Sequence, residues 1–267
     1  MKKILYAAAL MAVVMCAFTA CKKDNKKDET EEPTTITIKR LKQCGDEWDK
    51  YVFTYNDAGK VIDINRNAGE KQWTISSWEG NEIKANYVTR KKDAEGKYTI
   101  KDEEGVWTFT FGSNGYLSKL ANQWNDTWGF TYDNDGHLTK IVRVDKDNAV
   151  KCNLQWSNGN LVKWSRFKDS GAEEWKEQSF TDEDNVGGIF PDMTDKADVM
   201  RHWFELGWIG KPSKKLLDEA AWAESTSVAT HTYTKDAGNY VTKVEKYYDT
   251  ELDQTYEYEW EEVTITK

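Results

Sequence analysis

The sequence predicts a mainly β protein, in which antiparallel hairpins follow one another as a meander and curl into a large barrel that stays in water, with one short helical insertion near residues 192–206. Three observations predict this fold. One hairpin unit recurs along the 267-residue chain, a single segment with helical spacing interrupts it, and 13% of the residues are aromatic. Because aromatic side chains bury a large area each, we expect a folded core although the hydrophobic share is only 39%.

The hairpin unit consists of alternating aromatic residues, a turn rich in Asn, Asp and Gly, and a second apolar stretch. Tyr51, Phe53 and Tyr55 are spaced by two and therefore share one face of a strand, while Thr54 takes the other face. Gly59 falls where the turn needs a positive φ. The copies are 51–64, 107–120, 128–141, the shorter 154–164, a fifth at 231–244 whose turn we expect to be two residues longer, and a weaker one at 75–83.

The second strand of each unit is predicted to be bulged or twisted near its start. Apolar residues follow the glycine at positions two and five, as Val61 and Ile64 do after Gly59. Those two positions have opposite parity, so a regular strand would place them on opposite faces. The strand is therefore not expected to alternate ideally.

The repeat spacing gives about 14–18 strands in total. A sheet of that width curls, splits or closes, and closure also removes its unpaired edges. A barrel of this size leaves an interior space. The strand face opposite the aromatic residues carries Thr, Lys, Glu and Asn, whereas a membrane-spanning strand presents an apolar face to lipid. We therefore expect a polar outer wall and an aromatic interior.

Residues 191–224 interrupt the hairpins and are predicted to hold a helix. Asp192 or Thr194 is a suitable N-cap, and the helix should run to Leu206 and end at Gly207. Its apolar stripe consists of Ala197, Met200, Trp203 and Phe204. Such a stripe is usually buried, and we expect the helix to plug or cap the opening of the barrel.

The N-terminus is predicted to be a targeting segment followed by a tether. Residues 1–20 have a cationic start and 15 consecutive apolar residues, which is short of the ~20 that a spanning helix needs. Cys21 follows directly, and residues 22–34 are charged and have no apolar residue, which predicts a disordered tether. Residues 35–267 then form a single barrel domain that includes the insertion 191–224. The alternative is an ordinary secretory signal cleaved after Ala20.

Residues 18–21 (FTAC) resemble a bacterial lipobox, with Phe18 where the pattern prefers Leu. The resemblance implies that Cys21 is lipidated, that the tether starts there, and that the membrane is reached through the lipid anchor only. The residue that follows Cys21 is Lys22 and not Asp, which resembles the pattern that sorts lipoproteins to the outer membrane. The charged tract also resembles the surface-export signals of Bacteroidota lipoproteins. An outer-membrane lipoprotein is expected, with exposure at the cell surface as a further expectation.

The hairpins are similar to the YD repeats of Rhs-type proteins, and residues 132–141 (YDNDGHLTKI) are the closest copy. Together with residues 208–216 (WIGKPSKKL), the hairpins resemble a family of Bacteroidota lipoproteins of unknown function with a porin-like β fold. The resemblance covers most of residues 36–267. It implies the porin-like architecture and no particular activity.

The composition and motifs exclude several function classes. An excess of 46 acidic over 37 basic residues argues against a nucleic-acid partner. The sequence has no catalytic or nucleotide-binding motif, so we predict neither an enzyme nor a cofactor. The acidic turns 133–136 and 182–185 are oxygen-rich, but Asn, Asp and Gly are what such turns require, so we predict no metal there. Cys44 and Cys152 are either a disulfide or two buried thiols, and we favour the thiols.

The tryptophans suggest a glycan site, because sugar rings stack on indole faces. Trp107 and Trp128 are in register with the repeats and are expected in the core. The candidates for ligand binding lie off that register or beside turns: Trp48, Trp73, Trp124, Trp175 and Trp208. The alternative for these five is also core packing.

The leading hypothesis is a non-enzymatic, lipid-anchored envelope protein that binds a ligand, with a glycan as the first candidate, or that serves as a structural or docking module. The alternatives are a glycan-active hydrolase with an unrecognised carboxylate site and an assembly subunit that binds other envelope proteins.

Overall fold

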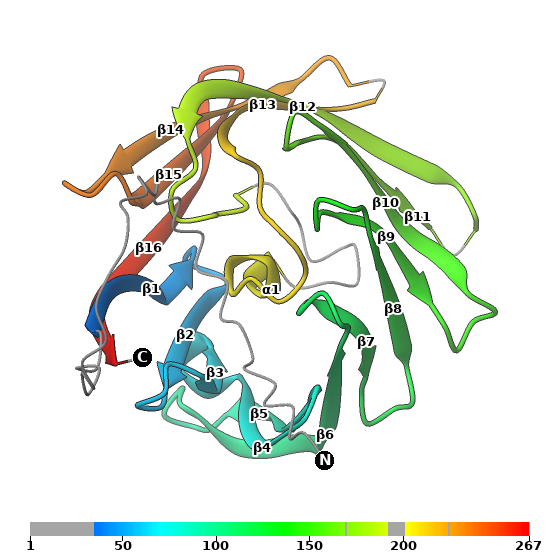
Figure 1. Ribbon diagram of the computed structural model, residues 1–267, viewed down its shortest axis with the longest axis vertical. Helices are drawn as coiled ribbons and strands as arrows, with labels where there is room; N and C mark the ends of the chain where they lie inside the picture. Colours follow the sequence, from blue (N-terminus) through cyan, green and yellow to red (C-terminus); the bar gives the residue numbers. More distant parts are fainter. Residues whose placement is uncertain (1–34, 169, 192–200, 224, 267) are drawn as a thin grey trace, which may run out of the picture.

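The computed structural model describes residues 35–168, 170–191, 201–223 and 225–266, and in this part of the chain sixteen strands form one closed barrel (Figure 1). The predictions for residues 1–34, including Cys21, and for residues 192–200 lie outside the described residues. The strands are β1 (Thr35–Gly45), β2 (Lys50–Tyr55), β3 (Val61–Arg66), β4 (Lys71–Glu79), β5 (Glu82–Lys92), β6 (Tyr98–Phe111), β7 (Leu117–Ala121), β8 (Thr127–Tyr132), β9 (Leu138–Arg143), β10 (Ala149–Ser157), β11 (Asn160–Phe167), β12 (Glu173–Asp184), β13 (Lys215–Trp222), β14 (Val228–Lys235), β15 (Val241–Tyr248) and β16 (Glu251–Thr266). The helical elements are the 3₁₀ turn η1 (Asn67–Gly69) and α1 (Arg201–Glu205).

Each strand pairs antiparallel with its neighbours in sequence, and β1 pairs with β16 to close the barrel. The predicted meander and its closure are confirmed, and the strand number falls inside the expected range. Opposite charges meet at the closing seam, where Arg40 Nε lies 2.6 Å from Glu261 Oε1 and Lys42 Nζ lies 2.5 Å from Glu259 Oε1.

The up-and-down topology gives the barrel two rims. The first, here called the plug rim, carries both ends of the described barrel, where Thr35 pairs with Thr266, and also the β12–β13 connection that contains α1. The other, here called the opposite rim, carries the β3–β4, β5–β6 and β7–β8 connections.

The hairpin units fold as predicted. Tyr51 and Phe53 are buried, and Gly59 has a φ of 74°. Thr54 pairs with Asp63 and Tyr55 with Val61, so Ile62 has no partner and is the predicted bulge. The bulge places Val61 and Ile64 together in the core. The same register shift recurs in the copies that begin with β6, β8, β10 and β14.

The fifth copy corrects one expectation. Its turn has the same length as the others, because Asp236 N–H bonds to Tyr240 O as Asn56 N–H bonds to Lys60 O. The positive φ of 65° lies at Asn239, not at Gly238. Asn tolerates the left-handed region better than most residues and therefore replaces the glycine.

A hydrogen bond that the sequence did not reveal links successive hairpins. The last aromatic residue of a hairpin's first strand donates to the carbonyl just before a bulge in the preceding strand. Tyr55 Oη donates to Leu41 O and Tyr132 Oη to Leu117 O, both over 2.6 Å, and Trp156 Nε1 donates to Leu138 O over 2.7 Å. These bonds fix the stacking of one aromatic unit on the next.

We predict that Tyr132→Phe lowers the free energy of unfolding by about 1–2 kcal/mol, because it leaves the Leu117 carbonyl without this donor. Urea denaturation measures the change. Tyr98→Phe is the matched control, since the Tyr98 hydroxyl makes no hydrogen bond to a described residue, and it should change stability by less than about 0.5 kcal/mol. Equal effects of the two changes would contradict the assigned role.

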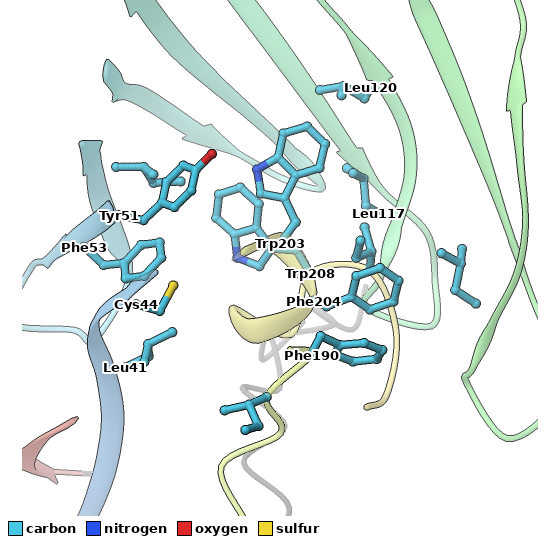
Figure 2. Packing of buried hydrophobic residues seen from close by; sticks show 14 of the residues in the cluster. Leu41, Cys44, Tyr51, Phe53, Leu117, Leu120, Phe190, Trp203, Phe204 and Trp208 are labelled. Carbon is cyan, nitrogen blue, oxygen red and sulfur yellow. The ribbon is translucent and has the colours of Figure 1, made fainter. Parts of the chain in front are cut away.

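The helix α1 lies inside the ring of strands (Figure 1). Its last residue is Glu205, one residue before the predicted Leu206, and the predicted terminating residue Gly207 has a φ of 71°. The Trp208 N–H bonds to Trp203 O over 2.9 Å and the Gly207 N–H to Phe204 O over 2.8 Å, which is the Schellman arrangement. Trp203 and Phe204 are each 1% exposed, and Figure 2 shows them between the wall with Tyr51 and Phe53 and the wall with Leu117.

The segment after α1, residues 208–214, is bonded to the plug rim at three points and is here called the plug stalk. Trp208 O accepts from Leu117 N–H, Lys211 N–H donates to Gly136 O, and Lys214 N–H donates to Gly159 O, at 2.8–3.0 Å. On the other wall, Glu205 of α1 accepts from Cys44 Sγ and Tyr258 Oη, each at 3.0 Å. The prediction that the helix plugs the barrel is therefore confirmed for its described residues, 201–205, and the plug stalk holds it in place.

Candidate functional site

The five candidate tryptophans do not gather in one place. Trp73 is 1% and Trp208 is 8% exposed, and both belong to the core. Trp48 is 73% exposed in the β1–β2 connection, and Trp175 lies on β12 with Lys163 Nζ 4.6 Å from its ring centre. Trp124, in the β7–β8 turn, is 50% exposed and is the only one of the five that lines a sizeable hollow among the described residues.

This hollow lies at the opposite rim and has a volume of about 510 Å³. It is bounded by the β3–β4 connection, the outer halves of β5 and β6, and the β7–β8 turn. Its lining residues are Glu70, Lys71, Tyr87, Thr89, Arg90, Lys91, Lys92, Tyr98, Asp102, Glu103 and Trp124. A second cavity, beneath the plug stalk, measures about 20 Å³ and has room for no more than a water molecule.

Strand register builds the floor of the hollow as two rows. Trp73, Tyr87 and Gly105 are direct cross-strand partners on β4, β5 and β6, and they form the aromatic row. Two residues further toward the rim, Lys71, Thr89 and Glu103 are partners in the same way and form the polar row. Residues two apart on a strand share a face, so both rows face the hollow.

Gly105 lets the β7–β8 turn fold over the aromatic row. A Cβ atom at Gly105 would lie 2.2 Å from the Gln123 Cβ atom, so any larger residue would displace the turn. The turn is held by Asn122 Oδ1, which accepts from the Trp124 and Asp126 N–H groups over 3.0 Å. As a result the Trp124 ring lies 6.2 Å from the Tyr87 ring, edge to face.

Tyr87 places a phenol at the bottom of the hollow. The residue is 4% exposed, and its hydroxyl makes no hydrogen bond to any residue that the structure describes. Burial raises the pKa of Tyr87 to about 12, and the carboxylates of Glu103 and Glu70 act in the same direction. The phenol therefore stays protonated at neutral pH and offers a donor to a ligand.

Several charges at the rim of the hollow are already engaged. Lys91 Nζ lies 2.6 Å from Asp102 Oδ1, and Lys92 Nζ lies 5.1 Å from the centre of the Tyr98 ring. Arg90 donates to Gly69 O and to Gln72 Oε1, each over 3.0 Å, and so ties β5 to the β3–β4 connection. Lys71 and Glu103 enter no salt bridge with a described residue.

An ion cluster supports the turn that carries Trp124. Arg143 bonds to Asp126, and its Nη2 lies 2.8 Å from Asp145 Oδ2, while Asp145 Oδ1 accepts from Thr127 N–H over 2.8 Å. The hydrogen bond from Arg143, followed by the bond from Thr127, lowers the pKa of Asp145. Asp145 therefore stabilises the folded state above the unfolded pKa of about 3.9, and this contribution is lost as the pH falls.

We predict that the melting temperature of the protein falls more steeply than that of the Asp145→Asn variant as the pH is lowered from about 5 to about 2. The plots of melting temperature against pH for the two proteins should converge at the acid end. Asp147→Asn, in the same β9–β10 turn, serves as the control and should follow the wild type. Parallel curves for wild type and Asp145→Asn would contradict the role given to the cluster.

The acidic turn at residues 133–136 has a structural role. Asp133 Oδ1 accepts from the Asp135 and His137 N–H groups, and Asp133 Oδ2 lies 3.1 Å from His137 Nδ1. Asp93 holds its own turn with the same two backbone bonds. Possible ligand atoms of Asp133, Asp135 and His137 lie within 4.8 Å of one another, but the bonds match those of the other turns. Asn185, in the second acidic turn, bonds to Ile189 and Ser213.

The two cysteines of the barrel and two of its histidines lie in the core. Cys44 and Cys152 are buried thiols, each 0% exposed, and they do not form a disulfide with each other, which agrees with the expectation from the sequence. Burial raises the pKa of the Cys152 thiol to about 12. His137 stacks on Trp156 at 4.4 Å and His202 on Tyr51 at 4.1 Å. No helix in the described part of the chain is long and apolar enough to cross a membrane.

The fold and the hollow together define a closed β-barrel with a helical plug in its lumen and an aromatic hollow at its opposite rim. The chain belongs to the family described as a domain of unknown function (DUF4595) with porin-like fold, whose pattern matches residues 77–243, more than half of the chain. The expected family, of unknown function and porin-like fold, is thereby confirmed. The likeness of the hairpins to YD repeats stays a prediction.

A solved structure of a porin-like protein from Bacteroides uniformis is similar to this chain, with a TM-score of 0.54 and 18% sequence identity. The alignment covers 86% of this chain and 98% of that one. At this identity the likeness concerns the fold. No curated protein matches the chain.

Proposed function

We propose that this protein is a lipid-anchored protein of the bacterial outer membrane that binds a glycan in the hollow at its opposite rim and does not alter it. The observation that carries the proposal is the half-exposed Trp124, held against the protonated phenol of Tyr87 in a hollow that is also lined by a row of polar side chains. A flat aromatic face beside hydrogen-bonding groups is the surface that a sugar ring requires.

The plug supports binding rather than conduction. Trp203 and Phe204 fill the lumen, and the plug stalk is bonded to the plug rim. This arrangement favours binding of a ligand in the hollow over passage of a solute through the barrel. The protonated phenol of Tyr87 is a poor nucleophile, which favours binding over hydrolysis.

The wall of the barrel supports a location in water. On β8, β9 and β10 the outward row is Thr131, Lys140 and Asn153, whereas the inward row of Phe130, Ile141 and Cys152 is buried. A membrane-spanning barrel has the reverse polarity, with an apolar band facing lipid. Attachment through Cys21 is consistent with such a wall.

The topology also supports outward display of the site. The barrel begins at Thr35 on the plug rim, and the predicted tether of residues 22–34 enters there. An anchor on Cys21 would hold the plug rim toward the membrane and leave the hollow at the far end of the barrel.

Glycan binding is tested with the full chain in detergent micelles, by a glycan array followed by tryptophan-fluorescence titration. We expect Trp124→Ala to weaken binding at least tenfold, as loss of a central aromatic contact of about 2 kcal/mol does. Trp48→Ala, an exposed tryptophan outside the hollow, should bind like the wild type. Flat responses to all host and microbial glycans, or equal binding by Trp124→Ala, would remove the proposal.

Analysis of the glycans after these titrations distinguishes binding from hydrolysis. Shortened glycans after incubation would favour the hydrolase, since Glu70, Asp102 and Glu103 line the hollow.

The anchor is tested in cells by metabolic labelling with an alkyne fatty acid. We expect the label on the wild type and none on Cys21→Ser, and an unlabelled wild type would contradict lipidation.

A further inference from the structure

The polar row of the hollow carries two charges of opposite sign with a hydroxyl between them. Lys71 on β4 and Glu103 on β6 flank Thr89 on β5, so their Cα positions are two strand spacings apart, about 9.5 Å. Neither charge enters a salt bridge with a described residue. The row as a whole is neutral and has donors at one side and acceptors at the other.

The groups beneath and beside this row complete the pattern. Thr89 Oγ1 accepts from the Glu103 N–H over 3.1 Å, which leaves its own O–H free to donate. The Tyr87 phenol below it is a further donor, and Glu70 adds a carboxylate on the Lys71 side. Glu70 Oε2 accepts from Asn67 Nδ2 over 2.8 Å and Glu70 Oε1 lies 3.6 Å from Arg66 Nη1, so this carboxylate is partly engaged. A ligand that spans this row therefore meets both donors and acceptors, and Trp124 lines the same hollow.

A ligand with a net negative charge and a ligand with a net positive charge are both disfavoured, each by the residues of like charge in the hollow. An acidic sugar would be drawn to Lys71 but would also face the carboxylates of Glu70 and Glu103, and its desolvated charge would be only partly compensated. An amino sugar would meet Lys71 and Arg90 in the same way. Hydroxyl groups donate to the carboxylates and accept from Lys71 and Tyr87, so they satisfy every group at once.

We infer that the hollow is selective for an uncharged pyranose unit, whose face lies on Trp124 and whose hydroxyls span Lys71 and Glu103. This inference rests on the proposed glycan binding and deepens it. Glu103 and Lys71 are then the residues that set the charge selectivity, Glu103 against acidic sugars and Lys71 against amino sugars.

The test uses three matched oligosaccharide series that differ only in the terminal unit: a neutral hexose (glucose, galactose or mannose), the corresponding uronic acid, and the corresponding 2-amino sugar. Affinities of the full chain are measured by isothermal titration calorimetry. We expect the best neutral ligand to bind at least tenfold more tightly than its acidic and amino counterparts.

The variants assign the selectivity to residues. Glu103→Gln should reduce the preference for neutral over acidic sugars by at least fivefold, and Lys71→Gln should do the same for amino sugars. Glu104→Gln is the matched control, because Glu104 is the adjacent exposed carboxylate on β6, does not line the hollow, and should leave both ratios unchanged.

Tighter binding of an acidic or amino sugar than of the neutral one, or unchanged ratios in Glu103→Gln and Lys71→Gln, would overturn the charge selectivity while glycan binding stands. Failure of all three series to bind would overturn both the inference and the proposed function.

Discussion

Replacing Trp203 by alanine is expected to lower the free energy of unfolding by about 3–5 kcal/mol, the range for a large aromatic residue lost from a core. Trp203 is 1% exposed and meets Trp107 and Phe109 edge to face, with ring centres 6.0 and 5.6 Å away. Because Trp203 lies on α1 and its ring packs against the rings of two wall residues, the wall cannot close over the space that the indole leaves without moving the helix.

Urea denaturation followed by circular dichroism measures this change. Trp48→Ala is the matched control, since Trp48 is 73% exposed and its loss should change stability by less than about 0.5 kcal/mol. A loss below about 1 kcal/mol for Trp203→Ala would mean that the helix is not part of the core.

Gly210→Ala is expected to destabilise the protein by about 2–4 kcal/mol, because it combines backbone strain with overpacking. Gly210 has a φ of 98°, which favours glycine, and a Cβ atom there would lie 3.0 Å from both Gly136 O and Leu138 N. These are backbone atoms of the β8–β9 hairpin and cannot move alone. The plug stalk would have to withdraw, and the bond from Lys211 N–H to Gly136 O would be weakened.

Gly207→Ala separates the two contributions. Gly207 also has a positive φ, of 71°, but a Cβ atom there would have no neighbour within 4 Å. It should therefore cost only the conformational part, about 1–2 kcal/mol. Thermal and urea unfolding of both variants measure the difference, and a Gly207→Ala loss as large as that of Gly210→Ala would show that stalk packing contributes little.

The barrel was predictable from the sequence because the residue patterns that specify each hairpin are local and recur along the chain. The spacing of Tyr51, Phe53 and Tyr55 fixes the inward face, and the opposite parity of Val61 and Ile64 is enough to indicate the bulge. The termination of the helix before Gly207 follows from the same kind of local signal.

The inward or outward direction of single tryptophans was not predictable in this way. On β12 the side chain that enters the core is Lys176, which is 2% exposed, and Trp175 takes the other face. The ammonium of Lys176 lies 5.9 and 4.9 Å from the ring centres of Trp164 and Trp222, so cation–π contacts offset part of its burial. Which side chain points inward depends on the neighbours across the sheet, and the sequence of one strand alone does not identify these neighbours.

The hollow depends on a contact between distant residues and was therefore missed. Tyr87, Lys71 and Glu103 come together only through the register of three strands. One signal was available: Gly105 lies inside a strand and not in a turn, which indicates that another segment approaches closely. The approaching segment is the turn that carries Trp124, the one ligand-binding candidate that the structure places at the hollow.

A helical plug fills the lumen and leaves the opposite rim as the proposed binding end. Native-state hydrogen–deuterium exchange of residues 203–211 in the full chain measures whether this plug is held in place. The amides of Trp208 and Lys211 are bonded to Trp203 O and Gly136 O, so they should exchange as slowly as those of the wall strands. Exchange of both amides as fast as in the exposed β1–β2 connection would show that the lumen is not held closed, and would contradict the account.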